Sequence, residues 1–479
     1  MSQTTTIRLT RHISPQDKEV NDHLMLPFDV PDGIAELQIA YTYTREGSHE
    51  PHRSPDNLVD IGLLAPGGTP FPCERGFRGW SGTARHDIRL SADAATPGYL
   101  PGPITPGRWH VMLGAYKLLP EGTDCEVTIR LTPGPVGRDS FLPAVGQDSI
   151  LPRVLRPGPA WFHGDLHCHT HHSDGRGPLE NLLARAREAR LDFLAVTDHN
   201  TVSHHADLAA YREEDVLLIP GQEVTSYRGH ANVWGCGEWM DFRVRTPQDI
   251  IWVVERAHRC SGLISLNHPK YDGPNWELGT DLDVDCVEVW QAPWFVSNCE
   301  SLAFWEGMLN AGRRVPCVGG SDCHIAATPE SQPIPYLGQP TTLVWAEELS
   351  VKGILDAIRA GHVHITSGPD GPHLRLEALA GGQQAMAGDL LRTAPGEEVL
   401  FRVGAQGGDG MWLRIVSGGR EVARWVVDGN DFAAEWKTPA GDAWYRLDLL
   451  YPLSPEEEHD PTAVLLEGMT NPIYVRAQP

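Results

Sequence analysis

The sequence lacks the features of membrane-spanning, secreted and nucleic-acid-binding chains. Its 479 residues contain no run of about 18 apolar residues, so no membrane span is expected. The first residues, MSQTTTIRLTRHISPQDK, have no apolar core of the length that a signal peptide needs. Basic residues are few: 39 Lys and Arg against 63 Asp and Glu give a formal net charge of −24. That charge argues against nucleic acid as a partner.

Cysteine pairs of the metal-binding or redox type are also missing. The nine cysteines include no C-x-x-C pair, and their number is odd. This pattern favours reduced thiols over a disulfide framework, and we therefore expect a cytoplasmic protein. No G-x-S-x-G nucleophile elbow and no G-x-x-x-x-G-K phosphate loop is apparent, which argues against serine hydrolases and P-loop enzymes.

What is present divides the chain into three parts. Residues 1–135 contain short alternating stretches such as AELQIAYTYT and CEVTIRLTP between Gly/Pro-rich turns, and this pattern predicts a β-sandwich-like domain. A proline-rich linker is predicted over 136–160. Residues 369–479 return to β-type patterning, as in EVLFRVGAQ and AWYRLDLLY, and predict a second, smaller β domain.

Between these parts, residues 161–368 alternate strand and helix patterns, which is typical of an α/β fold with a parallel sheet, open or closed into a barrel. Helices are predicted to begin at Pro178, Thr246, Ser297 and Ser350. The predicted strands are WFHGDLH, DFLAVTD, VLLIPGQEV, HANVWG, GLISLNHP, CVEVWQAP, VPCVGGSD and TTLVWAE.

Histidines and carboxylates gather at the C-terminal ends of these predicted strands. In parallel α/β folds such ends converge on one face, where reactive groups are placed. Imidazole nitrogens and carboxylate oxygens suit Zn²⁺, Mn²⁺ or Fe²⁺. Nine side chains are therefore predicted to be metal ligands: His167, His169, Asp174, His199, Glu223, His230, His268, Asp322 and His324.

These segments resemble a known family. The run DLHCHTHHSDG, followed by TDHN, GQEV, GH, NHP and GSDCH, is similar to the ligand pattern of the polymerase and histidinol phosphatase (PHP) superfamily over roughly residues 161–368. The resemblance implies a distorted (β/α)7 barrel that holds two or three divalent metal ions. The first ion would take His167, His169, Glu223 and Asp322. The second would share Glu223 and add His230 and His268. The third would take Asp174, His199 and His324.

The flanking segments GFRGWSGTARHDI and TNPIYV resemble the carbaryl-hydrolase branch of this superfamily. We expect an enzyme that hydrolyses small phosphoesters through metal-activated hydroxide, with Glu223, Asp322 and His324 at the reacting centre and Lys270 as a phosphate contact. Two alternatives stay open: a carbamate, carboxylic ester or amide hydrolase with the same centre, and a non-catalytic metal-stabilised binding module.

The partners are expected to be small molecules, without nucleic acid or membrane, and the sequence predicts no oligomeric state. The β domains are expected to supply no ligands, and a fragment of residues 155–370 is expected to keep its metals if it folds. A second H-x-H pair, His362 and His364, follows a predicted helix without neighbouring carboxylates and is not counted among the ligands.

Overall fold

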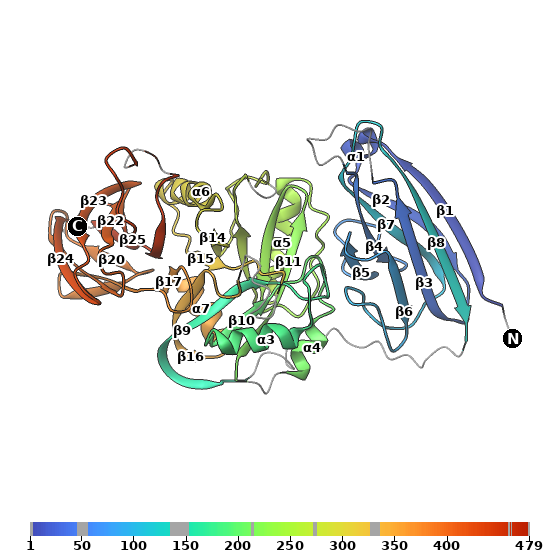
Figure 1. Cartoon of the computed structure of the whole chain (residues 1–479), viewed down its shortest axis with the longest axis horizontal. Coiled ribbons are helices and arrows are strands. Elements are labelled where there is room, and N and C mark those ends of the chain that lie inside the picture. Colours follow the sequence, from blue (N-terminus) through green and yellow to red (C-terminus); the bar gives the residue numbers. More distant parts are fainter. Residues whose placement is uncertain are drawn as a thin grey trace.

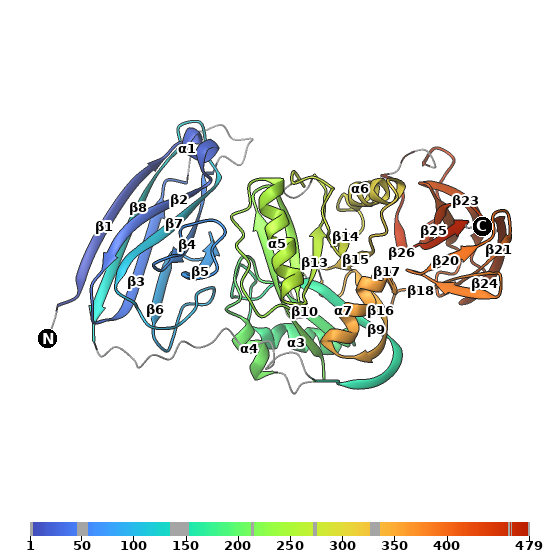
Figure 2. The ribbon, with the colours of Figure 1, turned by 180° about the vertical axis from the view of Figure 1, so that it is seen from behind.

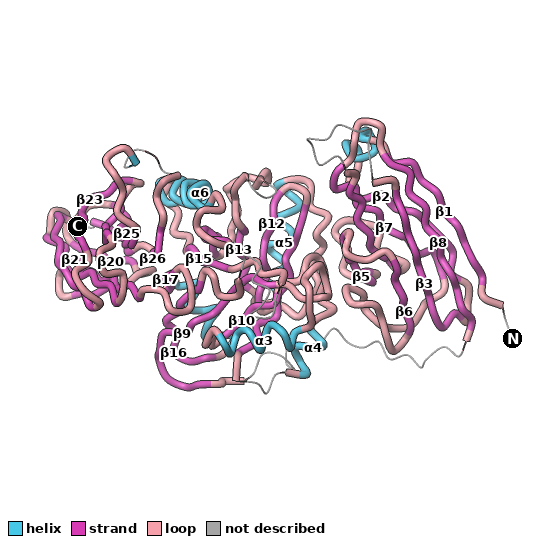
Figure 3. The backbone as a smooth tube through the Cα atoms, in the orientation of Figure 1, coloured by secondary structure: helices cyan, strands magenta, loops and turns pink. Residues whose placement is uncertain are grey.

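A computed structural model describes residues 3–45, 56–134, 153–211, 215–271, 275–325, 336–457, 460 and 462–477. The molecule is elongated, with a β-rich part at each end and the helices concentrated between them (Figures 1 and 3). None of the helices in the described ranges combines the length and the apolar character needed to cross a membrane.

The N-terminal part consists of two four-stranded antiparallel sheets, with a short helix, α1 (Pro15–Val20), at one end. Inward-facing side chains alternate with exposed ones, as the period of a strand requires, and the inward rows form a shared core around Ile39, Val111 and Ile129. One sheet has the order β1 (Thr5–Ile13), β8 (Thr123–Pro133), β3 (Ile34–Tyr43) and β6 (Asp87–Ser91). The other has the order β2 (His23–Val30), β7 (Gly107–Lys117), β4 (Leu58–Leu64) and β5 (Phe77–Gly82).

All eight strands predicted for the middle part are present. Along the sheet they run in the order β15 (Cys317–Gly320), β14 (Cys286–Gln291), β13 (Leu263–Asn267), β12 (Gly229–Trp234), β11 (Leu217–Ser226), β10 (Phe193–Val196), β9 (Arg156–Cys168) and β16 (Thr341–Leu349). The strand β17 (Val363–Thr366) follows β16. The strands β10, β13 and β15 are buried along their whole length, which explains their continuous apolar character.

The four predicted helices begin where expected. They are α3 (Leu179–Glu188), α5 (Pro247–Arg259), α6 (Asn298–Asn310) and α7 (Val351–Ala360), and a short fifth helix, α4 (His205–Ala210), was not predicted. Thr246 forms a capping box with Asp249 at the start of α5, and the Ser350 hydroxyl accepts the Gly353 N–H at the start of α7.

The predicted seven-fold barrel of alternating strands and helices is not seen among the described residues. The strand β12 is antiparallel to both β11 and β13. Only Tyr227 and Arg228 separate β12 from β11. A parallel connection needs a crossover of about a dozen residues or more, so this link can only form a hairpin. The fold is a strand-rich, mixed α/β arrangement rather than a regular barrel.

The end of β15 nevertheless returns to β9. The Asp322 N–H donates to the His167 carbonyl over 2.8 Å, and the His169 N–H donates to the Cys323 carbonyl over 3.0 Å. These bonds bring together the two ends of the run from β15 to β9, and with them the segments that carry the candidate ligands.

The C-terminal part continues the central sheet. The strand β26 (Leu466–Thr470) pairs with β17, and β25 (Ala443–Leu450), β22 (Trp412–Ser417) and β23 (Arg420–Val426) follow. A second sheet has the order β19 (Gln383–Met386), β18 (His373–Ala380), β21 (Glu398–Gln406) and β24 (Asp431–Pro439), and β20 (Leu390–Thr393) pairs with β27 (Ile473–Ala477). The buried side-chain amide of Asn471 accepts a hydrogen bond from the Cys317 N–H and donates one to the Cys317 carbonyl in β15. The C-terminal part therefore supports the middle part.

The predicted linker over 136–160 lies largely outside the described residues. Its last residues form the beginning of β9, which pairs with β16 from Arg156 onward. The sequence pattern did not predict that β9 begins at Arg156, because residues Arg156–Pro159 are exposed and proline-rich although their backbone is extended.

One disulfide corrects the expectation of reduced thiols. Cys236, after β12, is bonded to Cys260, at the end of α5, with a Cα–Cα distance of 5.7 Å. The helix packs back along the β12–β13 pair, and this tertiary arrangement brings together two cysteines that are 24 residues apart. Among the described cysteines the other seven are free, so the cytoplasmic expectation loses part of its basis.

Candidate metal centre

The predicted ligands converge where β9, β10, β11, β13 and β15 end. His167 and His169 lie at the end of β9, and Glu223 lies in β11 opposite His199, which follows β10. His230 comes from β12, while Asp322 and His324 follow β15. All nine predicted side chains belong to groups whose potential ligand atoms lie within 4.8 Å of one another.

The first group surrounds the inner end of the site. The Nε2 atom of His167 lies 3.4 Å from Glu223 Oε1 and 3.3 Å from Asp322 Oδ1. His169 Nε2 lies 2.9 Å from the same Asp322 oxygen and 3.8 Å from Glu223 Oε2. The His167 and Glu223 side chains are completely buried, so any group held here is shielded from water.

Glu223 also belongs to a second group. Its Oε1 atom lies 3.1 Å from His230 Nδ1 and 3.4 Å from His268 Nε2. The same carboxylate thus faces imidazoles of both groups, and this is the arrangement expected of a bridging ligand. Asn267 donates its amide to that oxygen over 3.2 Å and helps to fix the carboxylate.

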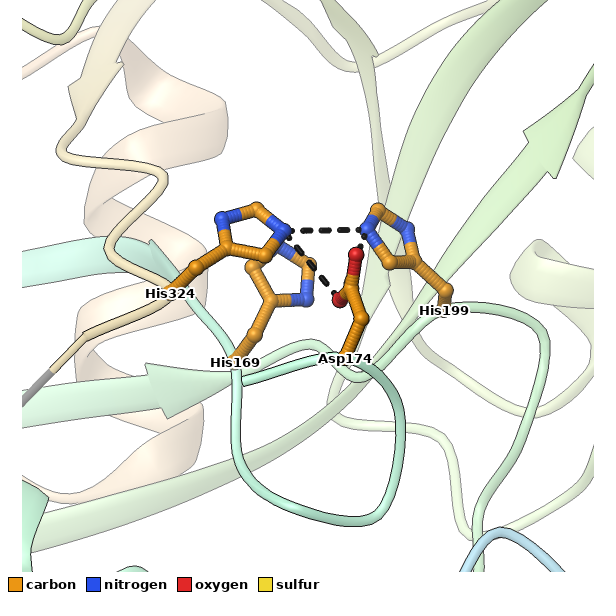
Figure 4. Close-up of side chains that lie close together, drawn as sticks. All are labelled: His169, Asp174, His199 and His324. Carbon is orange, nitrogen blue, oxygen red and sulfur yellow. Dashed lines mark hydrogen bonds and ion pairs between the residues drawn. The ribbon is translucent and has the colours of Figure 1, made fainter. Parts of the chain in front are cut away.

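The third group lies nearer the surface, where Asp174, His199 and His324 point toward one another beside His169 (Figure 4). His324 Nε2 lies 3.2 Å from both Asp174 Oδ1 and His199 Nε2. The Asp174 side chain is 48% exposed and that of His324 is 30% exposed, in contrast to the buried first group. The cluster therefore opens to solvent on this side.

The spacing and the hydrogen bonding fit divalent cations. Three buried ring nitrogens, His167 Nε2, His169 Nδ1 and His268 Nε2, have no hydrogen-bond partner. An orphaned buried nitrogen is costly unless another ligand satisfies it. In a tetrahedral site with bonds of about 2.1 Å, ligand atoms lie about 3.4 Å apart. The separations of 3.3 and 3.4 Å at His167 Nε2 and 3.4 Å at His268 Nε2 match that value.

The electrostatics of the cluster also favour a cation. Burial alone would raise the pKa of Glu223, but the imidazoles around it, His167 foremost, hold the pKa of this carboxyl well below its usual range. Burial lowers the pKa of His169 to about 4, with contributions from His324 and His199, so this imidazole is neutral and able to bind metal. Burial would also lower the pKa of His324, but Asp322 and Asp174 outweigh it and raise the pKa to about 10. Metal binding would therefore release the protons that now balance the carboxylates.

Two of the candidate ligands lie on unusual backbone. His268 has a φ of 29° and Asp322 a φ of 53°, in the left-handed region that residues with a side chain rarely adopt. Non-glycine residues hold such conformations only where the surroundings enforce them, and functional sites are common locations.

Buried aspartates hold the loops that carry ligands. Asp198 accepts from the backbone N–H and hydroxyl groups of Thr170 and Ser173, which fixes the turn between His169 and Asp174. Asp165 accepts the backbone N–H groups of His167, Ser321 and Gly338. Both residues therefore order backbone, and neither is seen to bind a ligand imidazole in the way that some metal sites use carboxylates.

That supporting role falls to Glu288, which the sequence did not predict. Its Oε1 atom bonds His167 Nδ1 over 2.8 Å and so directs Nε2 toward Glu223 and Asp322. A charged residue in the middle of the buried strand CVEVWQ was the available signal. Gln291, three residues later, donates to Asp322 Oδ2 over 2.8 Å.

The structure gives Lys270 a different role from the predicted phosphate contact. Its ammonium is buried and donates to the carbonyls of Gln291 and Val296 and to Asn298 Oδ1, at 3.3, 2.6 and 3.0 Å. It therefore holds the loop before α6. Arg228 forms ion pairs with Glu277 and Asp22. Arg176 has an exposed side chain, and its backbone N–H donates to the His324 carbonyl over 2.6 Å, so it lies beside the open group.

The N-terminal sandwich reaches the surroundings of the centre without contributing a residue to any of the described ligand groups. Tyr227, in the β11–β12 turn, donates to Asp60 Oδ2 over 2.6 Å. Gly98 N–H donates to Ser203, and Thr201 donates to the Gly98 carbonyl, so the 95–100 segment supports the loop after His199. Burial raises the pKa of Asp60 to about 6, although the Tyr227 hydrogen bond lowers it.

Residues 165–289, which lie within the middle part of the chain, match the model of the PHP domain. Two curated relatives, the 5′-3′ exoribonucleases Rnm of Salmonella typhimurium and Escherichia coli, are each 44% identical over 68 residues. That stretch is 13% of this chain, and the chain spans 22% of the length of these relatives.

Among solved structures, a two-domain protein of Bacteroides vulgatus with a predicted PHP-like metal-dependent phosphoesterase part is 14% identical. The match covers 68% of this chain and 96% of that chain, with a TM-score of 0.37.

Proposed function

We propose that this protein is a metal-dependent hydrolase with a di- or trinuclear centre that cleaves small phosphoesters. The observation that carries the proposal is the set of buried imidazole nitrogens without partners, spaced from shared carboxylate oxygens at metal-ligand separations. The PHP domain match over residues 165–289 supports a hydrolase of this class.

The candidate ligands fall into three sets, one for each ion. His167, His169, Glu223 and Asp322 would hold one ion. Glu223, His230 and His268 would hold the second, and Asp174, His199 and His324 the third. Zn, Mn or Fe ions held there would supply metal-activated hydroxide at neutral pH and would polarise the bond under attack. A substrate would enter on the side formed by the exposed Asp174 and His324. The buried Glu223 would hold the inner ligands in position.

Three features support a small phosphoester as substrate. The curated relatives are exoribonucleases, whose substrate is joined by phosphodiester bonds. The formal charge of −24 disfavours a long polyanion such as RNA itself. The exposed Arg176 beside His324 offers a cation for an outer phosphate oxygen, in place of Lys270.

The test combines metal content with a substrate panel. The purified chain, reconstituted with Mn²⁺ or Zn²⁺, should carry at least two metal equivalents, because nine ligands exceed what one ion can use. It should hydrolyse a phosphomonoester or phosphodiester faster than an aryl carbamate. One equivalent or none would refute the cluster, and a faster carbamate reaction would refute the substrate class.

Variants then separate the roles of the ligands. Glu223→Gln should lower kcat/KM by about 10³-fold or more and reduce metal content, since this carboxylate faces two groups. Asp174→Asn should leave more activity because it serves only the outer group. Glu435→Gln, in an exposed ion pair on β24, is the matched control and should behave as wild type. Equal residual activities for the two ligand variants would contradict the assignment.

A further inference from the structure

A row of aromatic side chains crosses one face of the central sheet at its junction with the C-terminal part. Trp161 on β9 lies directly opposite Trp345 on β16, and His364 on β17 lies opposite Thr470 on β26. The Trp161 and Trp345 ring centroids are 5.7 Å apart, and those of Trp161 and His364 are 4.7 Å apart. The other face of these strands is the apolar core beneath α7, so this row points away from it.

The row forms one wall of a cavity of about 610 Å³. The opposite wall comes from the sheet that contains β18 and β21, which meets β17 and β26 where the two parts join (Figure 2). Its polar side chains are His373, Arg375, Glu377, Gln384, Gln406 and Asp431. The size is within the range of about 300–1,000 Å³ that is usual for small-molecule sites. None of the predicted metal ligands lines this cavity.

His364 is a lining residue whose hydrogen-bonding groups indicate what kind of ligand the cavity would bind. Its side chain is 2% exposed, and neither Nδ1 nor Nε2 has a hydrogen-bond partner. Burial holds the pKa of this imidazole well below its usual range, and the nearby His373 and His163 contribute. A neutral imidazole has one N–H donor and one acceptor nitrogen, and leaving both unsatisfied in a buried position is costly. A ligand hydroxyl that donates to or accepts from one of these nitrogens would remove part of that cost.

We propose that this cavity binds a neutral carbohydrate ring. Sugar hydroxyls both donate and accept, as His364 requires, and the apolar C–H face of a pyranose packs on indole rings such as Trp161 and Trp345. The lining carries three carboxylates, Glu377, Asp389 and Asp431, against the single guanidinium of Arg375, which favours hydroxyl donors and repels anionic ligands such as nucleotides.

The site is separate from the proposed hydrolase centre, and the two can therefore be tested independently. The full-length chain is titrated by calorimetry with glucose, N-acetylglucosamine, maltose and cellobiose, and with the anionic nucleotides AMP and CMP for comparison. At least one sugar should bind with a Kd of about 1 mM or tighter, and the nucleotides should not bind. If a nucleotide binds more tightly than every sugar, or if no sugar binds, the proposal is overturned.

Variants locate the binding. Trp345→Ala and His364→Leu should weaken the sugar at least about tenfold, whereas His364→Gln, which keeps a donor and an acceptor, should retain more affinity. Gln406→Ala, on the exposed opposite wall, tests the same cavity without disturbing buried packing. Trp425→Ala in β23, outside the lining, is the control and should bind as wild type. Unchanged affinity in Trp345→Ala and Gln406→Ala would place the sugar elsewhere and refute the assignment.

Discussion

At the scale of single residues, burial decides which charges the protein keeps. Asp60 is nearly inaccessible and shares a hydrogen bond with Tyr227, yet it has no cationic partner in the described contacts. Glu223 is buried even more completely but is surrounded by imidazoles. The same side-chain chemistry therefore gives a raised pKa at Asp60 and a lowered one at Glu223.

Asp60 leads to a prediction about pH. Its pKa is about 6 in the folded chain and about 3.8 when exposed, so the folded state keeps a proton that the unfolded state loses. Stability from this group is present below pH 4 and is lost as the pH rises to 6. Asp60→Asn, which still accepts from Tyr227, should raise the free energy of unfolding at pH 8 by on the order of 2 kcal/mol. The gain should vanish near pH 4.

Denaturant unfolding of the chelator-treated protein at pH 4 and pH 8 measures this difference. Asp29→Asn, an exposed carboxylate of the same sandwich, should show little change at either pH. If Asp60→Asn is destabilised equally at both values, the carboxyl is ionised in the folded chain and the expected cause is absent.

The positions of the candidate ligands could be predicted because they follow strand ends, which apolar runs mark clearly. The roles of Glu288 and Lys270 could not be predicted in this way. Glu288 lies within a strand and bonds His167, which is 121 residues away in the sequence. The Lys270 ammonium donates to the Val296 carbonyl, so its role depends on how the loop before α6 folds. Such partners depend on tertiary contacts that a local pattern does not contain.

At the scale of elements, periodicity located the eight strands and four helices of the middle part, but it did not give the strand directions. The two predicted strands, VLLIPGQEV and HANVWG, leave only residues 225–229 between them. Such a short, Gly-containing connection indicates a hairpin, but the expectation of a parallel sheet overrode it. The short α4 was missed because six residues carry too little periodicity. The Cys236–Cys260 bond depends on how α5 packs and was likewise hidden.

The disulfide leads to a prediction about stability. It closes a loop of 24 residues, for which the chain-entropy model gives roughly 3 kcal/mol of stabilisation. Cys236→Ser should therefore lower Tm by several degrees and remove most of the sensitivity of Tm to reductant. Cys317→Ser, a buried free thiol, controls for placing a hydroxyl in the core. A wild-type Tm that is the same with and without reductant would contradict the prediction.

At the scale of the whole molecule, the three parts share cores. Leu64, Phe77 and Trp80 of the sandwich belong to the same apolar cluster as Met240 and Phe242 of the middle part. Arg243, paired with Asp241, also donates to the Thr69 and Pro70 carbonyls at 3.0 and 2.8 Å. Composition identified three regimes in the sequence, but it could not show that their surfaces are joined in this way.

These contacts change the expectation for a fragment of residues 155–370. Removing the sandwich would expose Phe242 and the buried Asp241–Arg243 pair, and removing the C-terminal part would leave β17 as an open edge. The fragment should aggregate or unfold at a lower temperature than the full chain. Size-exclusion chromatography, thermal unfolding and metal analysis of both chains measure this. A monomeric fragment with the metal content of the full chain would show that the parts are independent.

The bonds from Asn471 to Cys317 have a consequence for biosynthesis. The strand β15 leads directly to Asp322 and His324, and its support comes from Asn471, 154 residues further along the chain. On the ribosome, β15 is therefore made well before the residue that supports it. The segment that carries Asp322 and His324 can gain this support only after the C-terminal part has been made and has folded against β15.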